Sequence, residues 1–197
     1  MPDSLHLSIW FADFEPDKML PCAFELIEKF STSSTSPGIT GLAFHPISWN
    51  EPTILERRFR PGVPPAAAVA MAADLLHEDY AYVFEANWDL WTPGSPTAEW
   101  TLRPSPVKFI VRGEEFEAGE WEAQGNIEVD FGLDTPFLHE ELELTGELNS
   151  RVRTNVQNLV DFIHRAETNP GVETRLLWSE SDENLAQKLV SRLQKTQ

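Results

Sequence analysis

Segments with a two-residue apolar period and segments with a helical apolar period follow one another in the first half of the chain. Apolar and polar side chains alternate in three segments, which predicts strands at residues 5–12, 53–59 and 80–90, and the apolar and aromatic content of residues 39–49 predicts a fourth strand. Apolar side chains recur every three to four residues between them, which predicts a helix after residue 17 that ends near 30, and a second helix from about 65 to 76. Proline-rich and serine-rich stretches separate these segments.

The predicted elements of the first half follow one another in the order β-α-β-β-α-β. This is the order of the split β-α-β, ferredoxin-like motif. The likeness is one of topology, and it carries no iron–sulfur chemistry, because the chain has one cysteine and a cluster needs four thiolates. We therefore expect an N-terminal ferredoxin-like unit at residues 1–92.

The pattern changes after the proline- and glycine-rich stretch at residues 92–96. Short alternating segments separated by glycines predict strands at residues 98–103, 107–116 and 126–131. A helix is predicted at 150–168, a strand at 172–178, and a final amphipathic helix with Leu185, Leu189 and Leu193 on one side. We expect an α+β fold whose second unit, residues 97–197, combines antiparallel strands with two C-terminal helices. A structural pseudo-repeat of the first unit stays open.

The charge balance narrows the classes of partner. The chain has 32 acidic against 15 basic residues and a net charge of −17. Such a surface repels a phosphate backbone and an anionic membrane, so we expect neither nucleic acid nor membrane as a partner. The absence of a signal-peptide pattern near Met1 and the single cysteine, Cys22, lead us to expect a cytoplasmic protein.

The acidic residues are concentrated in residues 113–147, which contain no Lys or Arg. One interpretation is a docking face for a basic protein, with five glutamates as the partner-binding residues: Glu114, Glu115, Glu117, Glu120 and Glu122. The other interpretation is that these carboxylates lie on the solvent side of strands and keep the protein soluble. The acids around Asp130 and His139 lack calcium-loop spacing, so no metal site is predicted.

Tryptophans gather in the middle of the chain. If Trp91, Trp100 and Trp121 are exposed, they are candidates for anchoring a partner, because tryptophan is enriched where partners bind tightly. If they are buried, they form a seam between the two predicted units. The sequence leaves both alternatives open.

No motif points to a particular chemistry. The sequence lacks a G-x-S-x-G elbow, a phosphate-binding P-loop and a dinucleotide fingerprint, so no catalytic residue and no cofactor are predicted. The first hypothesis is a non-catalytic, immunity-protein-like binder that neutralises or docks a basic protein. The alternative is an enzyme or small-ligand-binding domain with a pocket on the ferredoxin-like sheet, and its rim would hold His45, Arg57, Arg58, Glu85 and Asp89. A homodimer built through exposed sheet faces is a third possibility.

Overall fold

The protein is a mixed α+β structure. The computed structural model describes residues 3–93, 100–138, 146–179 and 185–194. These residues form one seven-stranded antiparallel sheet and six α-helices, which confirms the α+β class expected from the sequence. No helix within these ranges is long and apolar enough to cross a membrane.

The elements of the first half follow the predicted order β-α-β-β-α-β. They are β1 (Ser4–Phe11), α1 (Pro16–Glu28), β2 (Ile39–Pro46), β3 (Leu55–Val63), α2 (Pro65–Ala73) and β4 (Tyr80–Pro93). The second half contains β5 (Trp100–Arg112), a 3-10 turn η1 (Phe116–Ala118), α3 (Trp121–Gln124), β6 (Ile127–Leu133), α4 (Thr135–Leu138), α5 (Gly146–Glu167), β7 (Val172–Ser179) and α6 (Leu185–Gln194).

The two strands expected at 98–103 and 107–116 are one continuous strand, β5, so that prediction was wrong. Pro104 and Pro106 interrupt the apolar alternation and suggested a gap, yet both pair with β4. Proline lacks the N–H that a neighbouring strand on both sides would require. The paired positions of β6 begin only at Lys108, so the prolines lie where β5 has a single neighbour.

The strand order of the sheet is β3-β2-β4-β5-β6-β1-β7. The first strand therefore lies between β6 and β7 and pairs antiparallel with both. Two strands, β5 and β6, separate it from β4. Both halves of the chain thus share one sheet, and its pairing does not confirm a ferredoxin-like unit or a pseudo-repeat. The predicted boundary between units falls mostly on residues 94–99, outside the described residues.

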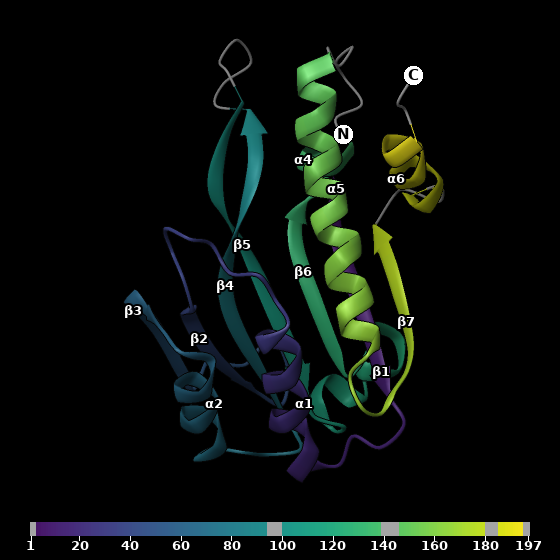
Figure 1. Ribbon diagram of the computed structural model, residues 1–197. Helices are drawn as coiled ribbons and strands as arrows, with labels where there is room; N and C mark the ends of the chain where they lie inside the picture. Colours follow the sequence, from purple (N-terminus) through teal and green to yellow (C-terminus); the bar gives the residue numbers. More distant parts are fainter. Residues whose placement is uncertain (1–2, 94–99, 139–145, 180–184, 195–197) are drawn as a thin grey trace.

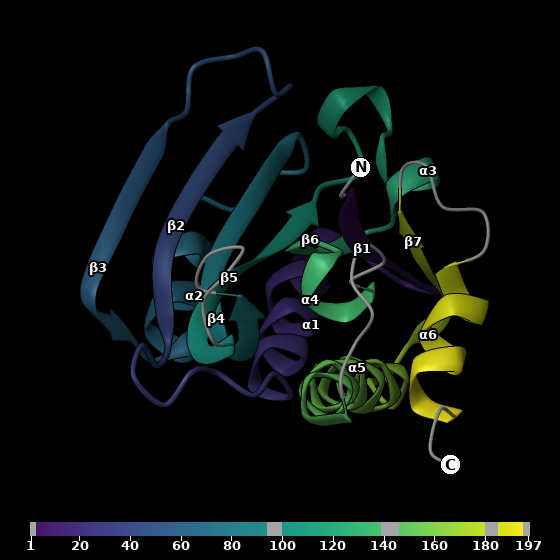
Figure 2. The same ribbon diagram turned by 90° about the horizontal axis from the view of Figure 1, so that it is seen from above.

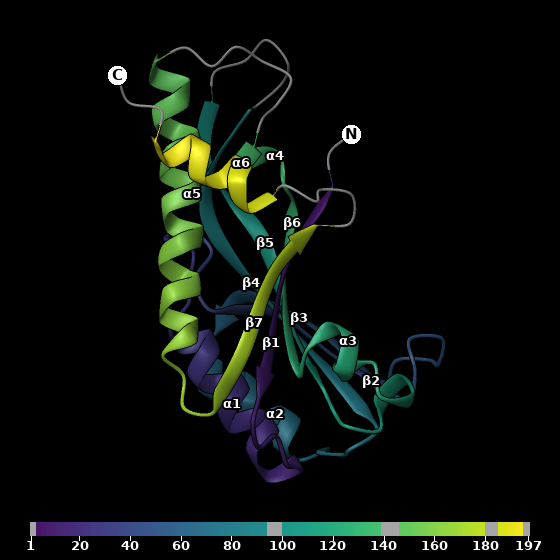
Figure 3. The same ribbon diagram turned by 90° about the vertical axis from the view of Figure 1, so that its right-hand side faces the viewer.

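Helices α1, α2 and α5 cover one face of the sheet, whereas α3 lies at the opposite face (Figures 1, 2 and 3). Phe30 after α1, Phe109 of β5 and Phe162 of α5 meet in the core, with edge-to-face rings whose centroids lie 5.3 Å apart for Phe30–Phe109 and for Phe30–Phe162. Such contacts add to area burial and fix how the helices lie on the sheet.

The period-two alternation sends polar side chains to the other face. In β1, Leu5, Leu7 and Ile9 are buried in the core, so His6 and Ser8 point away from the helices. Glu128 of β6 lies beside Ser8 in the pairing, and its neighbours Ile127 and Val129 are likewise in the core. The sheet face opposite α1, α2 and α5 therefore carries a set of ionisable side chains.

Candidate protein-binding surface

Three connections meet at one end of the sheet. They are residues 46–54 between β2 and β3, 77–79 before β4, and 113–122 after β5; together we call them the acidic tip. Their backbones are joined by hydrogen bonds from the Glu117 N–H to the Ile47 carbonyl (2.8 Å), from the Glu115 N–H to the Glu78 carbonyl (3.0 Å) and from the Ile47 N–H to the Asp79 carbonyl (2.7 Å). The three connections thus form one surface.

Gly113 permits the close approach of two of these connections. A Cβ atom at this position would lie 2.0 Å from the carbonyl oxygen of Glu78, far inside van der Waals contact. Only glycine lets the end of β5 pass this close to the backbone before β4. The glycine at position 113 therefore allows the 113–122 connection to pack against the 77–79 connection.

The acidic tip carries carboxylates of one sign only. Its acids are Glu51, Glu78, Asp79, Glu114, Glu115, Glu117, Glu120 and Glu122, and its three segments contain no Lys or Arg. Glu51, Glu78, Glu114, Glu115 and Glu122 are exposed. A concentrated, exposed charge of one sign raises the encounter rate with a partner of the opposite charge.

Large apolar side chains lie among these carboxylates. Ile47 is 58% exposed, Ile54 is 47% exposed and Trp49 is 36% exposed, and all three belong to the 46–54 connection. Single exposed apolar residues are ordinary, but here three of them fall within nine residues of one connection. An apolar centre with a charged rim is the anatomy of protein interfaces.

The backbone of the acidic tip is strained at three non-glycine residues. Ile47 has a φ of 59°, Glu117 of 47° and Ala118 of 53°. This left-handed conformation is most costly for a β-branched residue such as isoleucine. Strain of this kind persists only where the surrounding structure imposes it, and it is concentrated at functional sites.

Trp49 fastens the 46–54 connection to the 113–122 connection. Its backbone N–H donates to Glu117 Oε2 at 2.8 Å, and its indole Nε1–H donates to Glu120 Oε2 at 3.0 Å. Its ring packs edge-to-face on Phe116, with centroids 4.9 Å apart. These contacts hold the apolar side chains of the 46–54 connection and the carboxylates of the 113–122 connection in a fixed arrangement.

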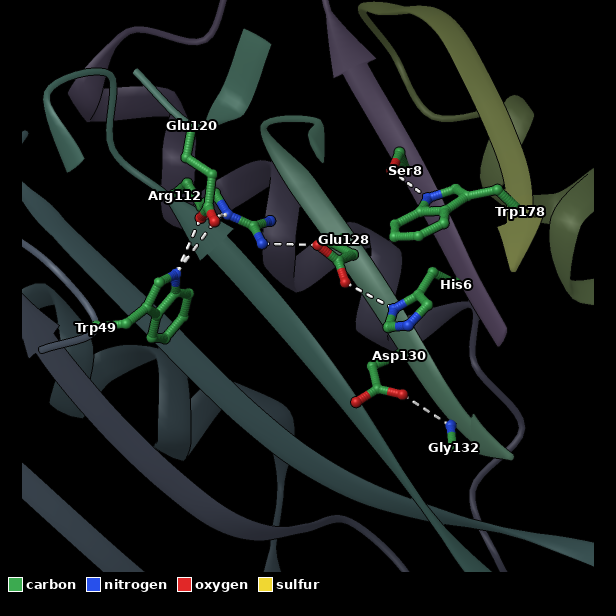
Figure 4. Close-up of polar contacts among 9 residues, drawn as sticks. All are labelled: His6, Ser8, Trp49, Arg112, Glu120, Glu128, Asp130, Gly132 and Trp178. Atoms are coloured by element: carbon green, nitrogen blue, oxygen red, sulfur yellow. Dashed lines mark hydrogen bonds and ion pairs between the residues drawn. The ribbon is translucent and has the colours of Figure 1, made fainter. Parts of the chain in front are cut away.

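A chain of ion pairs runs from the tip across the open face of the sheet (Figure 4). Arg112 donates from Nε to Glu120 Oε2 (2.7 Å) and from Nη2 to Glu128 Oε2 (2.6 Å). Glu128 Oε1 lies 2.7 Å from Nδ1 of His6, whose ring stacks on Trp178. Arg112 is only 3% exposed, so this network links β5, β6 and β1 beneath the surface.

The network keeps Glu128 ionised although it is buried. Burial alone would raise the pKa of this carboxyl, but the hydrogen bond from His6 and the charge and hydrogen bond of Arg112 outweigh it and lower the pKa below its usual value of 4.5. Glu120 and Glu128 are thus compensated inside the protein. The charge available to a partner comes from the remaining, exposed carboxylates.

His45 also packs against Trp49, with ring centroids 4.9 Å apart. Its Nδ1 is buried and has no hydrogen-bond partner among the described residues. Burial lowers the pKa of His45, so its ring is neutral at physiological pH. His45 therefore packs under the tip and adds no positive charge to it.

The predicted partner-binding residues fall into two separate regions. Glu114, Glu115, Glu117, Glu120 and Glu122 are all in the acidic tip, and Trp121 lies beside them at the start of α3, where its carbonyl accepts from the Trp10 indole (3.0 Å).

Trp91 and Trp100 lie at the opposite end of the β4–β5 hairpin. Arg151 of α5 lies over the Trp91 ring (4.7 Å) and donates to the Trp100 carbonyl (3.0 Å). Arg112 lies twelve positions after Trp100 along β5, about 40 Å at ~3.3 Å per residue. These two tryptophans cannot share a compact surface with the tip.

The structure does not bring the predicted ligand-binding residues into one pocket. Arg58 forms an ion pair with Glu85 on the open sheet face. Arg57 precedes Arg58 in β3, so its side chain points to the opposite face of the sheet. His45 pairs with Ala81, at the other end of β4 from Asp89, which is bound by Ser33 and Ser34.

Sequence reasoning missed the residues that complete the tip, namely Ile47, Trp49, Ile54 and Arg112. Arg112 had one visible signal, since it is the last basic residue before the 113–147 stretch. The apolar residues had none, because an aromatic and two isoleucines beside a predicted strand are read as part of that strand.

The acidic tip thus combines three exposed apolar side chains with exposed carboxylates, on three connections that backbone hydrogen bonds join. Within the described ranges, no three His, Cys, Asp or Glu side chains come close enough to hold a metal ion, and His139 lies outside those ranges. The chain matches no protein-family model, no curated protein and no solved structure.

Proposed function

We propose that this protein binds a basic protein partner, such as a toxin or nuclease, and neutralises or docks it through the acidic tip. The observation that carries the proposal is the exposed patch of Ile47, Trp49 and Ile54 within a rim of carboxylates and without a nearby exposed Lys or Arg in the three segments. Apolar anchors supply affinity, whereas the charged rim supplies encounter rate and selection of the partner.

The fixed backbone of the tip supports this proposal. A surface that is already in its bound shape loses little conformational entropy when it binds. The Trp49 hydrogen bonds to Glu117 and Glu120 and the joints to residues 78 and 79 provide such pre-organisation. A purely solubilising acidic segment has no need of left-handed, non-glycine residues, which cost stability.

Three finer aspects of organisation accompany the proposal. The element order from β1 to β4 supports a ferredoxin-like N-terminal unit at 1–92, with a second unit at 97–197 as its structural pseudo-repeat. The half-buried thiol of Cys22, the only cysteine, supports a reducing, cytoplasmic setting. Homodimerisation through the open sheet face is a further hypothesis, which light scattering would test.

Charge reversal at the rim tests the proposed function. Changing Glu114, Glu115 and Glu122 to lysine should abolish capture of basic proteins from lysate of the source cells, and the captured protein, once purified, should bind the unmodified chain with an association rate that falls steeply with salt. A matched control changes three exposed glutamates elsewhere, Glu25, Glu28 and Glu173, to lysine. Equal binding by both triple variants, measured with the purified partner, would contradict the proposal.

A substitution at Ile47 separates stability from binding. Asparagine tolerates the left-handed conformation, and the exposed isoleucine loses little buried area, so Ile47→Asn should stabilise the fold by about 1 kcal/mol and raise Tm by about 3 °C. The same change should weaken partner binding, because it removes an apolar anchor. Leu102→Asn is the control: Leu102 is exposed to a similar extent but lies in β5 without a left-handed backbone, so no gain in stability and no loss of partner binding is expected. Tighter partner binding by Ile47→Asn would contradict the proposal that the acidic tip is the binding surface.

A further inference from the structure

His45 lies at the end of β2, where the 46–54 connection of the acidic tip begins. Its neighbours Leu42 and Phe44 belong to the core, so the side chain of His45 points to the open face of the sheet. There its ring packs against the ring of Trp49, with centroids 4.9 Å apart. A titratable ring is therefore part of the support on which Trp49 rests.

The His45 ring is packed in a way that suits its neutral form. Its Nδ1 is buried and has no hydrogen-bond partner among the described residues. One nitrogen of a neutral imidazole is an acceptor and needs no proton, whereas both nitrogens of the imidazolium are donors. Protonation would place an N–H at a buried site without an acceptor, and burial also disfavours the positive charge. The packing around Trp49 is thus compatible with a neutral ring only.

The charged groups on the strands around His45 do not compensate an imidazolium. Burial lowers the pKa of His45 below 6.5 and outweighs the charge of Glu56 on β3, which favours the protonated form. Strand β4 places the uncharged Ala81 beside His45, and the next residue across the sheet is Arg112 of β5, a cation held by two glutamates. A proton on His45 therefore has no carboxylate of these strands as a close partner.

The 46–54 connection can move away from His45. Trp49 is 36% exposed, and two side-chain carboxylates hold it: Glu117 accepts from its backbone N–H and Glu120 accepts from its indole N–H (Figure 4). Ile47, midway between His45 and Trp49, has a strained φ of 59°. Release of the connection would relieve this strain and admit water to the His45 ring. A closed and an open arrangement of the tip thus compete.

The pH selects between the two arrangements. In the closed arrangement the pKa of His45 is lowered, whereas a ring in contact with water has its usual value of 6.5. Above about pH 6.5 the ring is neutral in both arrangements, so protonation favours neither. As the pH falls from 6.5 through the lowered pKa, the open arrangement takes up the proton first and gains stability relative to the closed one.

We propose that acid opens the acidic tip: protonation of His45 displaces Trp49 from its ring and detaches the 46–54 connection from the 113–122 connection. The carboxylates of the rim stay ionised meanwhile, because glutamate titrates near pH 4.3, roughly two units lower than histidine. The opening therefore changes the shape of the tip and not its charge. Its use for releasing a partner rests on the proposed function, whereas the opening itself is a property of this chain alone.

Hydrogen exchange of the Trp49 indole N–H, followed by NMR on the full chain without a partner, tests the proposal. The resonance is assigned by its loss in Trp49→Phe. The comparison protein is His45→Phe, which keeps a ring against Trp49 but takes up no proton. At about pH 7.5 the two proteins should exchange at the same rate, and at about pH 5.5 the unmodified protein should exchange about tenfold faster. Comparison at equal pH removes the intrinsic pH dependence of exchange.

Two further variants complete the test. His45→Gln, which is also neutral at every pH, takes the place of His45→Phe if the larger ring prevents folding. His77→Gln removes an exposed histidine of the 77–79 connection and should keep the acid response. Equal exchange in the unmodified protein and the His45 variant at about pH 5.5, or loss of the acid response in His77→Gln, would overturn the proposal. Charge reversal at the rim is read by partner capture, so failure of the proposed function is distinguished from failure of the opening.

Discussion

Replacing Arg112 with methionine should destabilise the protein by about 3–5 kcal/mol, measured by urea unfolding at neutral pH. Methionine fills much of the space of the arginine stem but leaves Glu120 and Glu128 without their shared cation. Glu128 is buried, so its uncompensated charge carries a large desolvation penalty. The Trp49 contact to Glu120 should loosen as well, because Arg112 no longer holds that carboxylate.

The matched control for this prediction is Arg58→Met. Arg58 also pairs with a glutamate, Glu85, on the same sheet face, but the arginine is exposed. Pairs of this kind contribute at most about 1 kcal/mol. Equal losses of stability in the two arginine variants would show that the buried network around Arg112 contributes no more than an exposed ion pair.

The loss of stability in Arg112→Met should also depend on pH. The pKa of Glu128 is lowered in the folded protein from its usual value of 4.5. The ionised carboxylate therefore stabilises the fold fully above about pH 4.5, and this stabilisation is lost as the pH falls through the lowered pKa of the folded state. Without Arg112 the buried carboxyl takes up its proton at higher pH. The difference in stability between the two proteins should therefore shrink as the pH falls from the value at which the variant's carboxyl takes up its proton to the lowered value of the unmodified protein.

Replacing Gly113 with alanine should cost about 3 kcal/mol, although the change adds a single methyl group. The added Cβ would lie 2.0 Å from the Glu78 carbonyl oxygen and 2.6 Å from its carbon, and backbone atoms cannot turn aside as a side chain can. The strand end and the 77–79 connection must separate, and the hydrogen bond from Glu115 to Glu78 is lost. Thermal unfolding measures the effect.

Gly119→Ala distinguishes this steric effect from a general intolerance of alanine in the tip. Gly119 has a φ of +91° and no atom within 4 Å of an added Cβ, so only backbone strain of about 1 kcal/mol is expected there. Equal losses in the two variants would show that close approach is not what Gly113 provides.

Local structure was predictable because it depends on neighbours in the sequence. The alternation around His6 and Ser8 predicted β1, and the helical spacing of Val152, Val156 and Leu159 predicted α5, which is buried along these residues. The break in apolar alternation at Pro104 and Pro106 led to the wrong prediction of two strands. It reflects the absence of a neighbouring strand on one side of β5 at these positions, and β5 continues through them.

The long-range arrangement was not predictable in the same way. Nothing local to His6 indicates that its neighbours are Asp130 and Trp178, and the sequence placed β1 with the other strands of the first half. The concentration of glutamates after Gly113 identified half of the tip. The other half, with Trp49, begins about 70 residues earlier, since Trp49 lies 68 residues before Glu117. The backbone hydrogen bond between Ile47 and Glu117 and the side-chain contacts of Trp49 bring the two halves together.

The position of β1 also determines when the sheet can be completed during synthesis. Its pairing partners Asp130 and Trp178 lie 124 and 172 residues after His6 (130 − 6 and 178 − 6). At ribosomal rates of roughly 5–20 residues per second, β1 waits on the order of 10 s for β6 and longer for β7. Such non-local pairing slows folding, and the nascent chain carries an unpaired apolar strand meanwhile. Strand β1 is thus made long before the two strands that enclose it.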